Sequence, residues 1–423
     1  MKRTYVILAA IFLGFFALGL PDGAFGVAWP YIRQEYNVPL ERAGFIFVVH
    51  SIFYALTTSC LGVISRYIKE EKVGSIGLFV MVLGLLGFAF ASSFFVHILF
   101  VALMGTGMGL VDGGFNAFVA KHYSGRVMNL LHCFWGVGAM VSPLIMTYAI
   151  VADGFTWRIG YGALAVLVTV IAVFARMLSP DGEGAACPSS ANGTCLALVP
   201  PAHRKKSTSG GSCGNRSRQI PLAELGQAAP SPPYTRGRIF LKGKWNEFMA
   251  VLMFFFYGGA EYGISFWVVS VLTESRGMST DAAGIYPAAF YGAMMAGRLL
   301  FVFFGTTVRD VTAVRFGIVL SIVGLVSFLF TTNIFGILLI GFGFGPVIPC
   351  AVSEVTRRFE PASTSRLVGY QFAALGGGVA ILATGLGWLL SNVSLEILFP
   401  AVIGLVVAAG VLNEILEKRM LYE

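Results

Sequence analysis

Long apolar runs separated by short polar breaks follow one another along the chain. Six lie in the first part, at residues 5–30, 43–64, 73–93, 96–119, 127–151 and 157–178. Six more lie at residues 247–272, 283–305, 312–331, 333–355, 367–390 and 396–415. A helix needs about 20 mostly apolar residues to cross a bilayer. The pattern therefore predicts an all-α integral membrane protein with twelve transmembrane helices in two six-helix halves.

The segment between the sixth and seventh runs is of a different kind. Residues 179–246 are rich in Gly, Ser, Pro and charged residues. Such a composition cannot bury enough apolar surface to fold alone, so it predicts a flexible linker. The expected organisation is a six-helix bundle at 1–178, the linker at 179–246 and a second six-helix bundle at 247–423.

Composition narrows the class of protein further. Of the 423 residues, 57% are hydrophobic and 12% are charged, whereas soluble domains carry roughly 25% charged residues. This excludes a soluble enzyme. The sequence contains no H-E-x-x-H motif, no C-x-x-C pair and no nucleotide-binding loop, so we expect neither an enzyme nor a metal or cofactor site. The net charge of +8 is interpreted as an orientation signal and not as a nucleic-acid footprint.

The loop charges predict how the helices are oriented. Four basic residues fall in short loops on one side, namely Arg33, Arg42, Arg158 and Arg276. Fourteen fall on the other side, namely Lys2, Arg3, Arg66, Lys69, Lys72, Lys121, Arg126, Arg309, Arg315, Arg357, Arg358, Arg366, Lys418 and Arg419. Because cytoplasmic loops carry an excess of Lys and Arg, both termini and the linker are expected in the cytoplasm.

A sequence motif that contains an acidic residue is repeated within the apolar runs. Residues 19–25 read GLPDGAF and residues 109–115 read GLVDGGF, while residues 258–261 give a looser GGAE. The tenth run is glycine-rich but has no acid. A motif that returns every three spans predicts nested three-helix inverted repeats, which are typical of transporters. Because spans 1 and 4 run in opposite directions, Asp22 and Asp112 should bracket a central site from its two sides.

A carboxylate in hydrocarbon costs at least about 2.5–3.5 kcal/mol. It is tolerated when it faces a polar cavity, is paired or is protonated. Asp22, Asp112 and Glu261 are therefore candidates for proton coupling or for binding a polar substrate. The alternative is structural, with an acid that caps a neighbouring helix or pairs with one cation.

Other polar and aromatic side chains are candidates for substrate contact. Asn129 and His132 share one helix face because they are three residues apart, and a histidine can also relay a proton. The remaining candidates are Asn116, Tyr262, Trp267 and Gln371. For each of them, packing or a local hydrogen bond is the alternative interpretation.

Two short loops share a Gly followed four residues later by an Arg. These are Gly62 with Arg66 and Gly305 with Arg309. Such an arginine can bind the last carbonyl groups of a helix and hold one half against the other. The alternative is that both arginines only set the topology.

The six-plus-six layout and the G-x-x-x-R loops after spans 2 and 8 resemble the major facilitator superfamily over all spans except the linker. The segments 19–30, 126–132, 258–261, 292–298 and 369–371 resemble its branch that includes fucose–proton symporters. That branch carries acids in its first and fourth spans, where this sequence has Asp22 and Asp112. The resemblance implies alternating access, with the two halves rocking about a midplane site. Arg66 stands where the superfamily's loop pattern has Asp, which puts the usual latch in doubt.

The sequence thus predicts a secondary transporter that moves a small polar solute, a sugar or sugar-like compound, by proton-coupled symport. A proton-coupled exporter of small amphipathic compounds and a non-transporting membrane sensor in the same fold are the alternatives. The expected partners are the solute, protons and membrane lipid, without nucleic acid. The protein is expected to be a monomer in the plasma or bacterial inner membrane.

Overall fold

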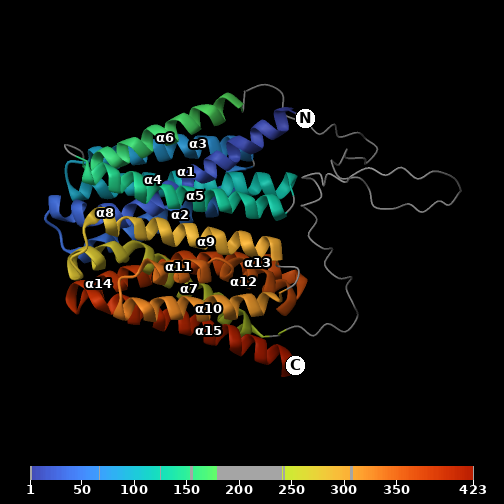
Figure 1. Cartoon of the computed structure of the whole chain (residues 1–423). Coiled ribbons are helices and arrows are strands. Elements are labelled where there is room, and N and C mark those ends of the chain that lie inside the picture. Colours follow the sequence, from blue (N-terminus) through green and yellow to red (C-terminus); the bar gives the residue numbers. More distant parts are fainter. Residues whose placement is uncertain are drawn as a thin grey trace, which may run out of the picture.

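The computed structural model describes residues 2–65, 67–123, 125–152, 156–178, 241, 243–304 and 308–422. Every regular element in these ranges is a helix, and the helices lie side by side in one bundle (Figure 1). The all-α fold class is confirmed. Residues 179–240, which form most of the predicted linker, lie outside the described ranges, and the next helix begins at Lys244.

The first half consists of six long helices at the positions of the first six apolar runs. They are α1 (Lys2–Glu35), α2 (Ala43–Ile64), α3 (Glu70–Phe90), α4 (Phe94–His122), α5 (Gly125–Val151) and α6 (Trp157–Leu178), with a short turn η1 (Leu40–Arg42) before α2. Lipid offers the backbone no hydrogen-bond partners, so an apolar run satisfies its own N–H and C=O groups by forming a helix.

The second half repeats this arrangement with some helices interrupted. Its long helices are α7 (Lys244–Ser270), α9 (Ile285–Phe304), α10 (Asp310–Phe330), α11 (Ile334–Phe344), α12 (Val347–Arg358), α13 (Pro361–Gly378), α14 (Thr384–Asn392) and α15 (Leu398–Tyr422). Its short elements are η3 (Val271–Ser275), α8 (Thr280–Ala283), η4 (Val379–Ala383) and η5 (Leu395–Ile397). The tenth predicted span is divided into α11 and α12 at Gly345 and Pro346, because proline has no N–H to continue the helix.

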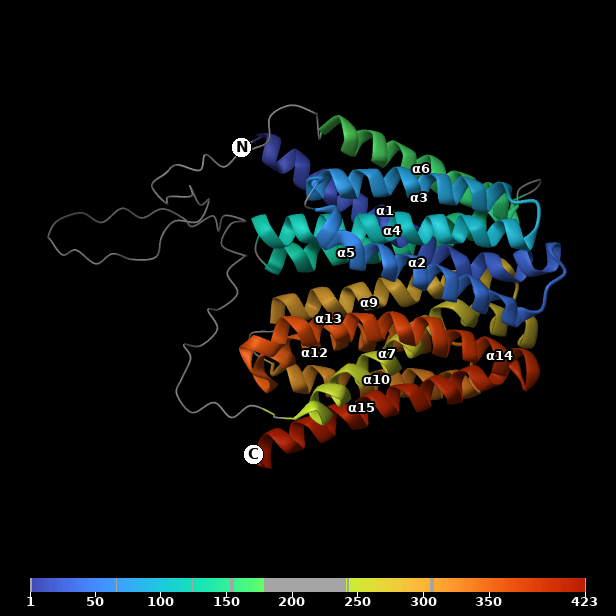
Figure 2. The ribbon, with the colours of Figure 1, turned by 180° about the vertical axis from the view of Figure 1, so that it is seen from behind.

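The described residues contain eleven helical stretches that are long and apolar enough to cross a membrane. Two of them each contain two α-helices, namely α11 with α12 and α13 with α14. α9 runs beside these stretches as the twelfth helix of the bundle (Figures 1 and 2). The chain is therefore an integral membrane protein.

The two halves pack their helices in the same order. α1 packs against α5 and α6, and α3 packs against α4 and α6. In the second half α7 packs against α13 and α15, and α10 packs against α11 and α15. Figure 1 shows the blue-to-green half beside the yellow-to-red half. This correspondence is the structural counterpart of the sequence repeat.

Glycines allow α1 and α5 to approach closely. A Cβ atom at Gly19 would lie 2.1 Å from the backbone oxygen of Trp135, and one at Gly138 would lie 2.0 Å from that of Phe16. A larger residue at either position would push the two helices apart. The close approach places Asp22, which is one turn beyond Gly19, directly against α5.

Both termini lie at one end of the bundle, which we call the terminal end, and the opposite end is the far end (Figures 1 and 2). Polar contacts join the two halves at the far end. Arg33, in the last turn of α1, forms an ion pair with Glu274 beyond α7.

Three more polar contacts accompany this ion pair. They are Tyr31 with Thr280, Ser391 with Glu41, and the Thr384 hydroxyl with the Gly44 carbonyl oxygen at 3.3 Å. Deeper in the bundle, the ring of Phe47 stacks on that of Phe266 with a centroid distance of 4.4 Å. The halves therefore close on each other at the far end.

Candidate functional site

Asp22 lies between the two halves and is held by Trp135. The indole N–H of Trp135, on α5, donates a hydrogen bond of 3.1 Å to the Asp22 carboxylate. The other half meets the same indole, because Tyr291 of α9 packs edge-on against it and the Arg298 guanidinium lies 5.6 Å from its centroid. One tryptophan thus connects the acid of the first half with the cation of the second.

Asp112 occupies a second polar position within the first half. It accepts hydrogen bonds from the Tyr54 hydroxyl at 2.6 Å and from the Asn116 amide nitrogen at 2.9 Å. The Asn116 side-chain oxygen is buried and has no hydrogen-bond partner among the described residues. Because a buried polar atom is costly without a partner, this oxygen is an available acceptor for a hydroxyl group of a bound solute.

Glu261 is the corresponding acid of the second half. It is 4% exposed on α7, one turn beyond Tyr257, whose hydroxyl donates to the Phe344 carbonyl oxygen at 2.9 Å. The positive charge of Arg298 acts on Glu261. The charges of Glu261 and Asp112 both act on Asp22, so Asp22 lies within electrostatic reach of the other two acids.

The two acids of the repeat lie on opposite sides of the bundle's middle. Asp22 is in the far-end half of α1, whereas Asp112 is in the terminal-end half of α4. This is the geometric arrangement expected from two copies of one motif on helices that run in opposite directions.

The remaining predicted contact residues fall into different surroundings. His132 packs edge-on against Phe15 at 5.4 Å and lies near Arg298, so it belongs to the central region. Tyr262 also lies there, close enough for the charges of Asp22 and Glu261 to act on it. The side chain of Asn129 lies outside the described part of the structure.

Trp267 and Gln371 instead serve helix packing. Trp267 is fully buried and donates its indole N–H to the Ala383 carbonyl oxygen at 3.0 Å, which leaves no ring face exposed for a sugar. Gln371 is 2% exposed and donates to the Ala250 carbonyl oxygen at 3.2 Å, which ties α13 to α7, while its side-chain oxygen, like that of Asn116, is buried without a hydrogen-bond partner among the described residues.

Sequence reasoning did not select four residues that the structure places at the centre. These are Tyr54, Trp135, Tyr291 and Arg298. A signal was present for Arg298, because it is a lone charge within an apolar run and intramembrane charges are usually functional. The aromatic residues carried no comparable signal among the many other aromatics of the chain.

Arg298 is unusual in its weak set of partners. Its Nε donates to the Gly345 carbonyl oxygen at a long 3.3 Å, and its Nη2 lies 3.5 Å from the Met294 sulfur. Among the described residues no carboxylate forms an ion pair with it. The site therefore combines an unpaired guanidinium with three carboxyl groups and several hydroxyl donors.

The predicted latch residues are only partly described. Gly62 lies in the last turn of α2, while Arg66 and Gly305 lie outside the described residues. Arg309 contacts Glu417 of α15 with a distance of 3.2 Å between Nη2 and Oε1. Glu417 belongs to the same half, so in this conformation Arg309 does not hold one half against the other.

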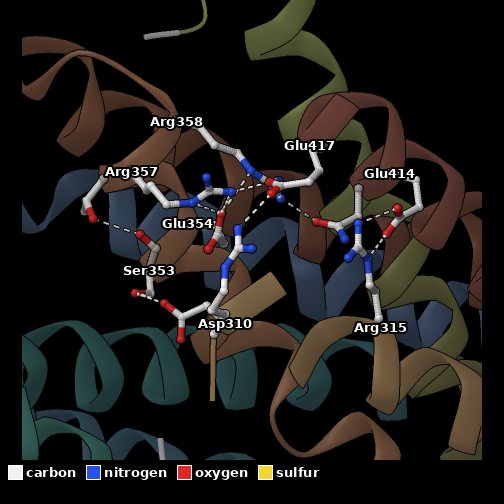
Figure 3. Close-up of polar contacts among 11 residues, drawn as sticks. Asp310, Arg315, Ser353, Glu354, Arg357, Arg358, Glu414 and Glu417 are labelled. Atoms are coloured by element: carbon white, nitrogen blue, oxygen red, sulfur yellow. Dashed lines mark hydrogen bonds and ion pairs between the residues drawn. The ribbon is translucent and has the colours of Figure 1, made fainter. Parts of the chain in front are cut away.

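Through Glu417, Arg309 joins a charge cluster at the terminal end of the second half, and Figure 3 labels its members Glu354, Arg357, Arg358 and Glu417. Arg357 and Arg358 of α12 both pair with Glu354 and with Glu417. Arg358, Glu354 and Glu417 are almost fully buried. Because removing one member of a buried ion pair leaves an uncompensated charge, this cluster fixes α12 to α15.

Membrane-spanning helices in two repeated halves, with charged and hydrogen-bonding side chains between them, define a membrane transporter. The sequence matches the model of the Major Facilitator Superfamily over residues 11–384. The chain belongs to this family.

Distant relatives and solved structures agree with this assignment. The chain is 24% identical over 326 residues to the sodium-dependent glucose transporter 1A of Mus musculus, which covers 74% of this chain and 71% of that protein. It is 22% identical over 182 residues to the riboflavin transporter RibZ of Clostridioides difficile, which covers 41% of this chain and 38% of RibZ.

Two crystal structures are similar over nearly the whole chain. A bacterial homolog of the human lysosomal transporter Spinster, in an inward-facing and unoccupied conformation, has a TM-score of 0.68, with 14% identity and coverage of 99% of this chain and 98% of that one. The nucleoside transporter NupG has a TM-score of 0.71, with 12% identity and coverage of 97% and 99%. At such identities the likeness concerns the fold alone.

Proposed function

We propose that this transporter carries a sugar or sugar-like solute together with a proton by alternating access. The observation that carries the proposal is the central site, where Asp22 of one half and Arg298 of the other both contact Trp135, and the charge of Glu261 acts on both. Polar groups contributed by both halves allow a solute to be bound between them and released when they rock apart.

The neutral groups of the site suit a polyhydroxylated solute. The free oxygen of Asn116 accepts a hydroxyl hydrogen, and Tyr54 and Tyr291 bring hydroxyl groups of their own. Aromatic faces such as that of Trp135 pack well against the apolar face of a sugar ring. The distant relationship to a sodium-dependent glucose transporter and the resemblance to the fucose–proton symporter branch support the same solute class.

The arrangement of the acids favours a proton as the coupling ion. Asp22 and Asp112 have separate hydrogen-bond partners. A proton needs only one carboxylate, whereas a sodium ion needs several oxygen ligands around it.

The excess of Lys and Arg in the loops at the terminal end supports an orientation in which both termini and the linker lie on the cytoplasmic side of a cell membrane. The far end, where polar contacts join the two halves, then faces outward. In this proposal the transporter is a monomer that takes up the solute and releases it at the terminal end.

The test is solute-driven proton movement in proteoliposomes that contain a pH-sensitive dye. A panel of monosaccharides and polyols is added outside, and Asp22→Asn and Glu261→Gln are compared with the parent. Asp281→Asn is the matched control. Hydrogen bonds from Ser279 and from the Ala282 backbone N–H lower the pKa of this exposed carboxyl, so it is already ionised at neutral pH.

Internal acidification with one sugar, lost in Asp22→Asn or Glu261→Gln but kept in Asp281→Asn, is the expected result. Sugar exchange without any dye response, in sodium-free buffer or with sodium, would refute proton coupling. If sodium alone drives uptake, the coupling ion is sodium. If no member of the panel moves, the carbohydrate assignment fails and the exporter becomes the leading function.

A further inference from the structure

A groove opens at the terminal end between α7 and α13, away from the central site. It has a volume of about 600 Å³. Its lining includes Lys244, Glu247, Phe248 and Val251 of α7 together with Arg366 and Tyr370 of α13. Nothing in the transport mechanism proposed above uses these side chains.

The polar side chains of the groove leave one positive charge without a partner. Arg366 pairs with Glu247, with distances of 3.1 and 3.3 Å from Nη2 to the two carboxylate oxygens. Lys244 is exposed and forms no ion pair with any described residue. It also stands in the first turn of α7, where the helix dipole adds positive potential. The groove therefore attracts a negatively charged group.

The groove lies at the height where a membrane changes from polar to apolar. The membrane-spanning stretches Lys244–Ser275 and Arg366–Asn392 both begin at these two basic residues. One turn further along the helices, Phe248 and Tyr370 are about half exposed, at 49% and 53%. The cations thus lie at the headgroup level and the aromatic rings lie just inside the hydrocarbon region.

A neighbouring tryptophan supports this placement. Trp245 is 63% exposed and its ring stacks on that of Phe248 with a centroid distance of 5.4 Å. Exposed Trp and Tyr residues are typical of the membrane–water interface. A soluble anion would use only the charged end of the groove, whereas a lipid would cover the apolar end as well.

We propose that this groove binds an anionic phospholipid. Its phosphate lies between Lys244 and Arg366, and an acyl chain follows Phe248 and Val251 along α7. Basic pockets between transmembrane helices on the cytoplasmic side are suited to such headgroups. The bound lipid bridges the ends of α7 and α13, and α7 is the helix that carries Glu261.

The experiment measures lipid binding to the purified, delipidated full-length protein. Phosphatidylglycerol and phosphatidylcholine with identical acyl chains are titrated, with retained lipid counted by native mass spectrometry. The parent should retain phosphatidylglycerol in preference to phosphatidylcholine. Lys244→Gln should weaken this binding roughly fivefold, and Lys244→Gln with Arg366→Gln roughly thirtyfold, as expected for removing one and two cations.

Lys418→Gln is the matched control, because Lys418 is an exposed lysine near the terminal end of α15, and it should bind phosphatidylglycerol like the parent. Equal retention of the two lipids by the parent would overturn the proposal, as would a Lys244→Gln protein that binds like Lys418→Gln. Full displacement of the lipid by inorganic phosphate would show that the groove recognises a free anion instead. If the double variant does not fold, Lys244→Gln and the headgroup comparison still decide the outcome.

Discussion

The ion pair between Arg33 and Glu274 should help to hold the far end closed, and Glu274→Gln is the change that tests this. The pair joins the last turn of α1 to the segment after α7, so it spans the two halves. Both side chains are only 22–23% exposed. A second contact runs from Arg33 Nε to Glu274 Oε1 at 3.3 Å, which makes the pair bidentate.

The size of the effect follows from this geometry. A fully exposed ion pair contributes about 0.2–1 kcal/mol, and a hydrogen bond to a charged group contributes about 1.5–3 kcal/mol. A bidentate pair with partial exposure lies between these ranges, at about 1.4 kcal/mol. Losing it should raise the ratio of far-end-open to far-end-closed molecules about tenfold.

The assay is a distance measurement across the far end. Spin labels at Ser92, between α3 and α4, and at Val393, after α14, report the separation of the halves in a background without the native cysteines. In Glu274→Gln the ratio of molecules at long distance to molecules at short distance should rise about tenfold. The charge-swapped pair Arg33→Glu with Glu274→Arg should return the distribution toward that of the parent.

An ion pair at the far end that lies within one half provides the control. Glu396 pairs with Arg276, and both residues lie in the second half, so Glu396→Gln should leave the distance distribution unchanged. If Glu274→Gln behaves like Glu396→Gln, the ion pair does not contribute to closure. If the charge swap fails to restore closure in a folded protein, the reasoning from a direct pair is wrong.

Two further predictions concern the centre and the terminal end. Trp135→Phe keeps an aromatic ring but removes the N–H that donates to Asp22. Proton-driven uptake should therefore fall about tenfold, which corresponds to a loss of about 1.4 kcal/mol. Unchanged uptake at equal expression would contradict this role of Trp135. Glu417→Gln removes one of the negative charges that balance the buried Arg358, so it should lower the free energy of unfolding by about 3 kcal/mol. Glu414→Gln removes one partner of a half-exposed ion pair with Arg315, so it should lower the free energy of unfolding by less than about 1 kcal/mol. Thermal unfolding in detergent compares the two, and equal midpoints would refute the distinction.

Part of the candidate site followed from residue chemistry alone. Asp22, Asp112 and Glu261 were selected because a carboxylate in hydrocarbon is costly and requires a reason. The repeat also predicted that Asp22 and Asp112 lie on opposite sides of the middle, as α1 and α4 place them. Both arguments need only the identity of a residue and its position along a helix.

The hydrogen-bond partner of each side chain could not be predicted in the same way. Trp267 and Trp135 are both tryptophans within apolar spans, yet Trp267 donates to a backbone carbonyl in a packed core and Trp135 donates to Asp22 between the halves. The difference depends on how each helix is rotated about its axis. The close crossing of α1 and α5 at Gly19 and Gly138 sets that rotation at the central site.

The sequence by itself determined the membrane class, the helices and the internal repeat. Lipid imposes these features locally, because each apolar run must satisfy its own backbone hydrogen bonds and each charge within it must be explained. Only the tertiary structure decided that Arg298 faces Trp135, that Arg309 pairs within its own half, and that the halves close at the far end. These are contacts between helices distant in sequence, and their energies depend on packing angles and on the conformation of the whole bundle.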